Sequence, residues 1–456
     1  MIFTTINPAT EEILENYEEM SAFLVEQKLK KANEIFPAWK KTSFKERSHK
    51  MLKVASVLRA KKLEYAKIMA LEMGKPLAQG IGEVEKCAWV CEYYAENAEQ
   101  FLKDKTVKTD YYKNYIAFQP IGAILAIMPW NFPFWQVFRF AAPNLMAGNV
   151  GILKHSPNTF GCSIKIEEAF LEAGFPEAVF TNLIIPVESV PQIIDSNHIA
   201  AVTLTGSTPA GSSVGTNAGK AIKKVVLELG GSDPYIIFKD ANLEKAAELC
   251  VTARTLNSGQ SCIAAKRFVV EKPVLDEFTK IFVQKMSQKV VGNPLDEKVN
   301  IGPQARRDLQ QNLHRQVVES VKLGAKIALG GELPSGKGYF YPATVLTNVK
   351  KGCPAYDEEV FGPVAAIISA EDEQEAINIA NDTKFGLGAA LFTKDIEKAE
   401  YLAKNVIQSG TCCVNDFVKS DPRLPFGGTK ASGYGRELSE FGIYEFVNIK
   451  TIAINE

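Results

Sequence analysis

The sequence has almost no net charge, and this limits the partners it can bind. Its 52 lysines and arginines nearly balance 53 aspartates and glutamates, which gives a formal net charge of −1 over 456 residues. A balanced chain offers no electrostatic attraction to nucleic acid or to a membrane surface. Neither kind of partner is therefore expected.

Signals for export, membrane insertion and metal binding are also lacking. The N-terminus has no basic stretch followed by an apolar core, so a secretory signal is not expected. The richest apolar stretch, 121–147, contains asparagines, an arginine and prolines, which excludes a transmembrane helix. Eight cysteines occur without a CxxC motif or paired Cys/His clusters, which argues against metal sites and disulfides. A reduced, cytoplasmic enzyme of two or three domains is the expected class.

Hydrophobic periodicity alternates between helix and buried strand along the chain. Helices are expected over 18–71 with a break near Pro37, then over 81–102, 133–146, 160–173, 190–195 and 242–257, with another beginning at Pro209. Strands are expected over 115–128, 150–154, 180–185, 200–205, 225–229, 235–238 and 267–270. This alternation predicts a parallel sheet covered on both faces, and its restart after Gly231 predicts a domain boundary near 229–232.

A dinucleotide site is suggested although the usual GxGxxG fingerprint is absent. Strand 200–205 ends at Gly206 and Ser207, and Pro209 fits the first turn of the following helix. Free N–H groups at such a helix start can bind a phosphate, although an ordinary strand–turn–helix connection shows the same pattern. Lys154, at the end of strand 150–154, suits a ribose hydroxyl or phosphate, or is a solvated lysine.

Cys262, in the turn Gly259-Gln260-Ser261-Cys262, is the candidate nucleophile. Upstream, Glu228 interrupts the apolar run 225–229, and an apolar strand raises the pKa of a carboxyl group toward the range of a general base. A thiol and a carboxylate base together suit oxidation of an aldehyde through a thioester. The alternatives are an inert buried cysteine and a paired core carboxylate.

Eight motifs in order identify a family. They are Met128–Pro133, Leu153–Ser156, Thr205–Ser207, Leu227–Gly231, Gly259–Cys262, Glu358–Pro363, Asn381 with Phe385–Gly388, and Pro425–Lys430. With them the chain resembles the NAD(P)-dependent aldehyde dehydrogenase superfamily from about residue 6 to the C-terminus, closest to bacterial succinate-semialdehyde dehydrogenases. The resemblance implies the α/β aldehyde dehydrogenase fold in a homodimer or homotetramer. Its parts would be a Rossmann-like coenzyme domain (1–103 and 122–228), an α/β catalytic domain (229–424), and a β oligomerisation arm with the C-terminal tail (104–121 and 425–456).

The resemblance also implies roles for individual residues. Cys262 would attack the aldehyde, the Asn131 amide would stabilise the oxyanion with the Cys262 N–H, and Glu228 would activate water. The cofactor, NAD or NADP, would be bound by Trp130, Lys154, Ser156, Pro157, Gly206, Ser207, Glu359 and Phe361. Many NAD-preferring members have a glutamate where Pro157 stands, so both cofactors stay open. Position 264 is alanine, so the second cysteine of a redox switch is not expected.

The substrate prediction depends on the helix after Pro133. Trp135 and Arg139 are four residues apart and share a helix face. A guanidinium among aromatic residues binds a carboxylate, which is either a substrate or an acidic side chain of the chain itself. The resemblance implies that Arg139 and Ser420 bind the carboxylate of succinate semialdehyde. A broad aldehyde dehydrogenase for neutral aldehydes and a catalytically silent structural relative stay open, whereas a CoA-acylating enzyme, which excludes water, leaves Glu228 without a use.

Overall fold

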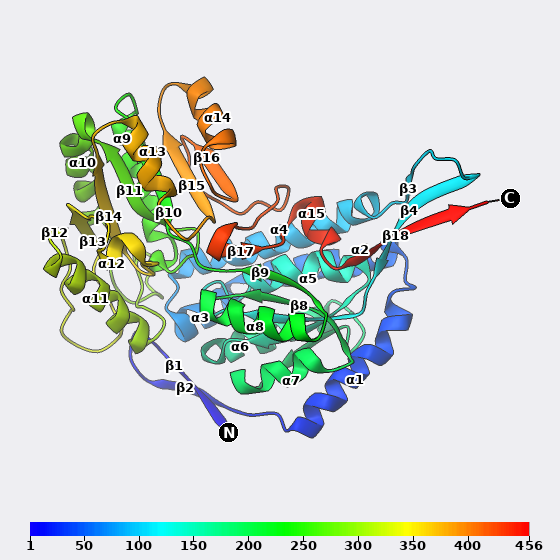
Figure 1. Ribbon diagram of the computed structural model, residues 1–456. Coiled ribbons are helices and arrows are strands. Elements are labelled where there is room, and N and C mark those ends of the chain that lie inside the picture. Colours follow the sequence, from blue (N-terminus) through cyan, green and yellow to red (C-terminus); the bar gives the residue numbers. More distant parts are fainter. Residues whose placement is uncertain (456) are drawn as a thin grey trace.

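Two mainly parallel β-sheets, each flanked by helices, form the body of the protein (Figure 1). The structure is a computed structural model that describes residues 1–455. The first sheet has the strand order β17-β9-β8-β5-β6-β7, in which only β17 is antiparallel to its neighbour. Its strands are β5 (Ala123–Met128), β6 (Val150–His155), β7 (Phe180–Leu183), β8 (Ile199–Thr205), β9 (Lys224–Glu228) and β17 (Gly433–Tyr434).

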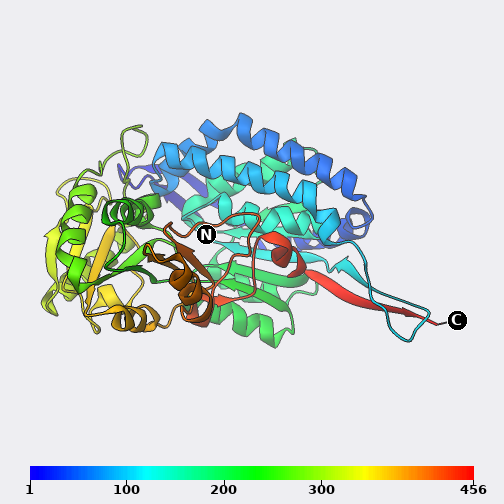
Figure 2. The ribbon, with the colours of Figure 1, turned by 90° about the horizontal axis from the view of Figure 1, so that it is seen from above.

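Helices lie on both faces of the first sheet, as the sequence predicts. One layer contains α5 (Trp135–Ala147) and α6 (Phe160–Glu172), with α2 (Phe44–Ala60), α3 (Lys62–Met73) and α4 (Leu77–Phe101) packed outside it. The short α7 (Val190–Asp195) and α8 (Thr208–Lys220) lie on the opposite face, and Figure 2 shows the sheet between α8 and the long N-terminal helices. Helix α1 (Ala22–Trp39) packs along β5, β6 and β7.

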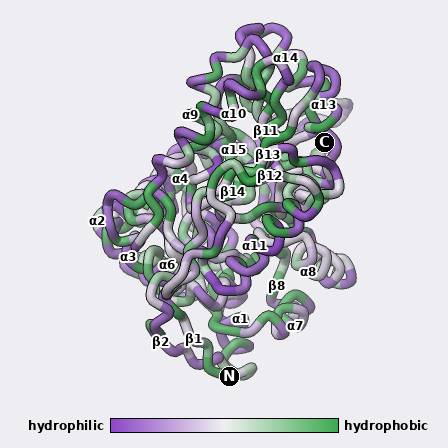
Figure 3. The backbone as a smooth tube through the Cα atoms, turned by 90° about the vertical axis from the view of Figure 1, so that its left-hand side faces the viewer, coloured by the Kyte–Doolittle hydropathy of each residue, from purple (hydrophilic) through white to green (hydrophobic). Residues whose placement is uncertain are grey.

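The second sheet has the order β12-β13-β14-β11-β10-β15-β16, with only β12 antiparallel. Its strands are β10 (Asp233–Ile237), β11 (Ala265–Glu271), β12 (Lys326–Leu329), β13 (Thr344–Thr347), β14 (Val364–Ala370), β15 (Gly388–Phe392) and β16 (Thr411–Val414). The helices around it are α9 (Leu243–Thr255), α10 (Leu275–Ser287), α11 (Arg307–Lys322), α12 (Pro354–Asp357), α13 (Glu373–Asn381) and α14 (Ile396–Asn405). Its central strands are buried on both faces, so they are continuous apolar runs; Figure 3 shows them as hydrophobic, with hydrophilic turns outside.

A three-stranded antiparallel sheet, β18-β4-β3, projects from the body at the end opposite the second sheet (Figure 2). It contains β3 (Lys105–Thr106), β4 (Lys113–Pro120) and β18 (Val447–Ile454), and α15 (Ser439–Tyr444) leads into β18. The remaining strands form a hairpin, β1 (Ile2–Ile6) and β2 (Ile13–Glu18). Short 3-10 turns occupy Pro157–Thr159 (η1), Val187–Ser189 (η2), Leu256–Gly259 (η3), Lys272–Val274 (η4) and Lys430–Ser432 (η5).

Two predicted elements were wrong. The run 115–128 is not one strand, because the chain turns at Gly122, whose φ of +137° favours glycine, so β4 joins the arm and β5 the first sheet. The region 18–71 begins with the end of β2, and Pro37 lies inside α1 rather than at a break; the chain leaves that helix only after Trp39. None of the helices in residues 1–455 combines the length and the apolarity needed to cross a membrane.

Candidate active site

Cys262 follows a turn whose backbone is held in an unusual conformation. Asn257, Ser258 and Gly259 have φ values of 53°, 57° and 75°, three successive residues in the left-handed region. A Cβ added to Gly259 would lie 2.2 Å from the carbonyl oxygen of Gly362, so only glycine fits there. Non-glycine residues adopt this region at a cost and do so mostly at functional sites. The strained backbone therefore indicates that the turn before Cys262 belongs to a functional site.

Side-chain amides join this turn to the loop after β5. The Asn131 side chain donates to the carbonyl of Gln260 at 3.1 Å. In return the Asn257 side chain donates to the carbonyls of Asn131 at 2.6 Å and Gln260 at 3.0 Å. All three residues are buried. The contacts bring the predicted oxyanion amide of Asn131 and the predicted nucleophile into one site across the two sheets.

The Cys262 thiol is half-buried and protonated at neutral pH. Burial raises its pKa to about 12, and the charges of Arg139 and Lys266 oppose that rise only in part. Lys266 donates to the carbonyls of Ser261 at 3.0 Å and Cys262 at 2.7 Å, so it also fixes the backbone around the sulfur. Because the thiolate is the nucleophilic form, the sulfur needs a proton acceptor before it can react.

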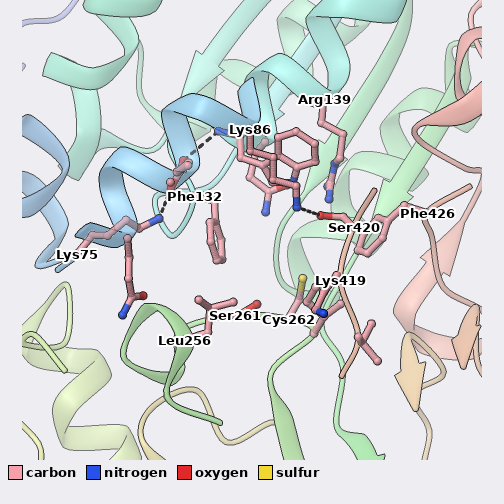
Figure 4. Close-up of a pocket in the computed structure, with 17 residues that line it drawn as sticks. Lys75, Lys86, Phe132, Arg139, Leu256, Ser261, Cys262, Lys419, Ser420 and Phe426 are labelled. Atoms are coloured by element: carbon pink, nitrogen blue, oxygen red, sulfur yellow. Dashed lines mark hydrogen bonds and ion pairs between the residues drawn. The ribbon is translucent and has the colours of Figure 1, made fainter. Parts of the chain in front are cut away.

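Cys262 lies between two cavities of about 250 Å³ and 440 Å³, both of which it lines. The smaller cavity is mainly apolar and aromatic but also contains cationic groups (Figure 4). The larger cavity extends from Asn131 toward the start of α8. Gln136 lines both. Cys262 can therefore be reached from two sides, one through each cavity.

The larger cavity contains most of the residues predicted to bind the cofactor. It is lined by Trp130, Gly206, Ser207, Glu359 and Phe361. Lys154, Ser156 and Pro157 are not among its lining residues: Lys154 is buried at the end of β6, Ser156 donates to Asn158 at 2.7 Å, and Pro157 begins η1. Burial lowers the Lys154 pKa to about 8.

The donors and walls of the larger cavity fit a nicotinamide dinucleotide. Ser207 is the N-cap of α8, whose first N–H groups suit a phosphate. The Glu359 carboxylate lies 3.5 Å from Lys266 Nζ and accepts from the Gly231 N–H at 3.1 Å, a position that suits ribose hydroxyls. Trp130 and Phe361 pack edge to face at 5.8 Å and form an aromatic wall. The cavity thus offers a phosphate site, a carboxylate and aromatic surface.

Arg139, Trp135 and Ser420, which were predicted to bind the substrate, all line the smaller cavity. Arg139 also forms an ion pair with Glu437 and donates to Thr205 at 3.3 Å. The intramolecular carboxylate partner that the sequence left open is therefore present, 298 positions along the chain. Arg139 therefore lines the smaller cavity while Glu437 balances its charge.

Two features of this cavity were missed by the sequence prediction. Lys86 of α4 reaches into it and donates to Ser420 Oγ at 2.7 Å (Figure 4). Glu83, one turn earlier, accepts from the N–H groups of Phe134 and Trp135, both at 2.9 Å, and pairs with Lys75. Glu83, Glu85 and Lys86 stand close together in the sequence of α4. Nothing in that local sequence identifies which face of the helix is covered.

Glu228 lies at the end of β9, outside the linings of both cavities, although Leu229 and Gly230 line the larger one. Neither of its carboxylate oxygens has a hydrogen-bond partner among residues 1–455. Burial, followed by the nearby Glu437, raises the pKa of Glu228 well above its usual range. The predicted base is thus a desolvated acid beside the site, not in contact with its cavities.

The two mainly parallel sheets, and the strained turn that places Cys262 between two cavities, are the features of an α/β enzyme. The model of the aldehyde dehydrogenase family matches residues 1–452, and the chain belongs to that family. A probable succinate-semialdehyde dehydrogenase (NADP(+)) of Synechocystis is 46% identical over all of both chains. The succinate semialdehyde dehydrogenase (NAD(P)+) Sad of Escherichia coli is 45% identical over 98% of this chain and 97% of its own. The structure of succinic semialdehyde dehydrogenase from Streptococcus pyogenes with NADP+ superposes with a TM-score of 0.97 at 36% identity, over all of both chains.

Proposed function

We propose that this aldehyde dehydrogenase oxidises succinate semialdehyde to succinate with NAD(P)+. The observation that carries the proposal is the smaller cavity: Cys262 lines it together with Arg139, Lys86 and Ser420, so cationic groups and a reactive thiol share one aromatic-walled space. An aldehyde that also carries a carboxylate matches this cavity, because its aldehyde carbon can lie at Cys262 and its carboxylate at the cationic groups. The names of the full-length relatives at 44–46% identity support the same substrate.

The reaction proceeds at the sulfur of Cys262. The Cys262 thiol first releases its proton to water in the site. The thiolate then attacks the aldehyde carbon and gives a thiohemiacetal whose oxyanion is stabilised by the Asn131 amide and the Cys262 N–H. A nicotinamide dinucleotide held by the residues that line the larger cavity would supply the hydride acceptor, and loss of hydride from the adduct would leave a thioester on Cys262. Removing one oxyanion donor costs roughly 10²–10³ in rate.

Hydrolysis of the thioester requires an activated water, for which Glu228 is the proposed base. The end of β9 continues directly into Leu229 and Gly230, which line the larger cavity. The proposed role requires the Glu228 side chain to rotate so that its carboxylate approaches the sulfur. Burial raises the pKa of Glu228 above its usual range, which favours the protonated acid over the carboxylate that activates water. Hydrolysis is therefore expected to accelerate as pH rises.

The residues proposed to bind the cofactor are Trp130, Lys154, Ser156, Pro157, Gly206, Ser207, Glu359 and Phe361. No carboxylate stands at position 157 to repel a 2′-phosphate, and Lys154 of β6 is the proposed cation for such a group. Use of NADP as well as NAD follows from this pattern. The proposed coenzyme domain is the one built on the first sheet, and the proposed catalytic domain the one built on the second.

The proposed assembly is a homodimer or homotetramer in the cytoplasm. The arm supports it, because β18 is an edge strand with exposed Ile449 and Ile454, and a long exposed edge is normally covered by another chain. All eight cysteines are free thiols in the structure, which suits a reducing compartment.

The test compares kcat/KM for succinate semialdehyde with that for butanal, which lacks only the carboxylate. A site built for the carboxylate is expected to favour succinate semialdehyde by about 10³-fold or more, because the neutral analogue leaves a largely buried cation without a partner. Equal values would contradict the proposal and leave a broad dehydrogenase for neutral aldehydes. The Cys262→Ala variant is the control, since retained turnover would refute covalent catalysis altogether.

A further inference from the structure

Four cationic side chains line the cavity of Cys262, and three of them are already paired with carboxylates. The pairs are Lys75 with Glu83, Arg139 with Glu437, and Lys419 with Asp416. Within residues 1–455 no carboxylate lies within ion-pairing distance of the fourth, Lys86. The charge of Lys86 is therefore the one that the protein leaves uncommitted in this cavity.

The Lys86 ammonium is held in place by groups that do not neutralise it. Its Nζ donates to Ser420 Oγ at 2.7 Å and lies 4.2 Å from the centroid of the Trp135 ring. Figure 4 shows this contact at the wall of the cavity that Cys262 also faces. An ammonium has three donors, so the hydroxyl of Ser420 leaves two for a ligand. Trp135 and Ser420 are both buried, so a ligand there is shielded from water.

The electrostatic surroundings of Lys86 favour an incoming anion. Burial, followed by the positive charge of Arg139 on α5, lowers its pKa to about 8. The groups that act in the opposite direction are weak partners. They are Glu83 and Cys87 on the same helix and Asp421 in the loop after β16, of which Glu83 already pairs with Lys75 and Asp421 with Arg423 at 2.7 Å.

We propose that Lys86 is the residue that selects for a carboxylate at the far end of the aldehyde, with Ser420 as its partner. The substrate carboxylate accepts from the Lys86 ammonium and the Ser420 hydroxyl, while the aldehyde carbon lies at Cys262. Arg139 also lines the cavity, but Glu437 already balances its charge, so Arg139 contributes less to the selection. This inference rests on the proposed function, because it assigns the specificity of that reaction to one side chain.

The first experiment measures the ratio of kcat/KM for succinate semialdehyde to that for butanal in three variants. Lys86→Met keeps the length of the side chain and removes its charge, and it is expected to lower the ratio roughly 10–100-fold, since a hydrogen bond to a charged group is lost. Arg139→Met is expected to reduce kcat/KM for both aldehydes and to move the ratio less. The matched control is Lys103→Met, an exposed lysine beyond the end of α4, which is expected to keep the wild-type ratio.

The second experiment measures the same ratio against pH, which cancels the titration of groups that both substrates need, such as Cys262. Because kcat/KM reports ionisations of the free enzyme, a lysine pKa lowered to about 8 predicts that the ratio is high below about pH 8 and falls above it. In Lys86→Arg the guanidinium stays protonated, so the alkaline fall is expected to disappear while part of the preference is retained. A purely structural lysine would change neither feature.

The outcomes separate the two proposals. A wild-type enzyme that does not prefer succinate semialdehyde contradicts the proposed function itself. A wild-type preference that survives in Lys86→Met and collapses in Arg139→Met overturns only the assignment of Lys86. A loss of the ratio in Lys86→Met, together with loss of the alkaline fall in Lys86→Arg, supports it. An independent measurement is the inhibition of butanal oxidation by succinate. Weaker inhibition in Lys86→Met, with unchanged inhibition in Lys103→Met, also supports the assignment of Lys86, and it does so without succinate semialdehyde as the substrate.

Discussion

Replacing Glu83 is expected to destabilise the start of α5, which forms part of the wall of the smaller cavity. Its carboxylate accepts from the N–H groups of Phe134 and Trp135, both at 2.9 Å, and pairs with Lys75. These N–H groups lie at the start of α5, where no intrahelical carbonyl is available to them. One side chain therefore ties α4 to the helix that presents Trp135 and Arg139 to the cavity.

The magnitude follows from how completely the pair is buried. The side chains of Lys75 and Glu83 are 0% and 2% exposed. Removing one member of a buried ion pair costs roughly 3–5 kcal/mol, because the other charge is left uncompensated. Each orphaned N–H adds about 1–3 kcal/mol unless water reaches it. Glu83→Ala is thus expected to lower the free energy of unfolding by at least about 3 kcal/mol.

The assay is urea-induced unfolding of the wild type and of a double-mutant cycle. Glu83→Gln keeps an oxygen for the two N–H groups but leaves the lysine charge alone, and Lys75→Met removes that charge. The double variant is expected to lie within about 1–2 kcal/mol of the wild type, since a neutral buried pair often replaces an ionic one at little cost. Hydrogen exchange of the Phe134 and Trp135 amides should quicken in Glu83→Ala. A loss below about 1 kcal/mol in Glu83→Ala, or single-variant losses that simply add in the double variant, would refute this reasoning.

Three further predictions concern the chemistry. Asn131→Ala is expected to lower kcat by roughly 10²–10³ with little change in the dissociation constant of the cofactor, measured by initial rates and cofactor titration; an unchanged kcat contradicts the oxyanion role. Alkylation of Cys262 in the free enzyme, followed by peptide mass spectrometry, is expected to be slow at neutral pH. Its rate should rise with pH without levelling off below about pH 10, because a pKa raised to about 12 keeps the thiol protonated until then. A rate that reaches a plateau near neutral pH contradicts this prediction. Pro157→Glu is expected to lower kcat/KM for NADP at least ~10-fold relative to NAD through repulsion of the 2′-phosphate, and equal losses for both cofactors would show that residue 157 does not face that group.

Local patterns sufficed for most of the first sheet. The run 150–154 and the run 200–205 are apolar stretches bounded by polar turns, and both are strands within a residue of the expected limits. Such runs need no partner to be recognised, because burial on both faces makes them apolar throughout. The failure at 115–128 has the opposite cause. Only the backbone at Gly122 separates two strands there, and mainly apolar residues continue across it.

The turn that leads to Cys262 could be located in the sequence, but the contacts that surround it could not. Cys262 and Asn131 stand in short motifs, whereas the partners of the charged residues are remote. Lys86 meets Ser420 across 334 positions, and nothing in the composition of α4 distinguishes that lysine from a solvated one. Arg139 was expected to bind either a substrate or an internal acid, and only the fold brings Glu437 to it. Long-range pairing of charges is set by topology, which residue spacing within one helix does not encode.

The measurement that tests the account most directly is mass spectrometry of the enzyme during turnover. Glu228→Gln, which removes the proposed base for hydrolysis, is mixed with succinate semialdehyde and NADP and quenched with acid. The account predicts a succinyl thioester on the peptide that contains Cys262 and none on the peptide of Cys412, a partly exposed thiol on β16. Formation of reduced cofactor and succinate with no acyl group on Cys262 would contradict it.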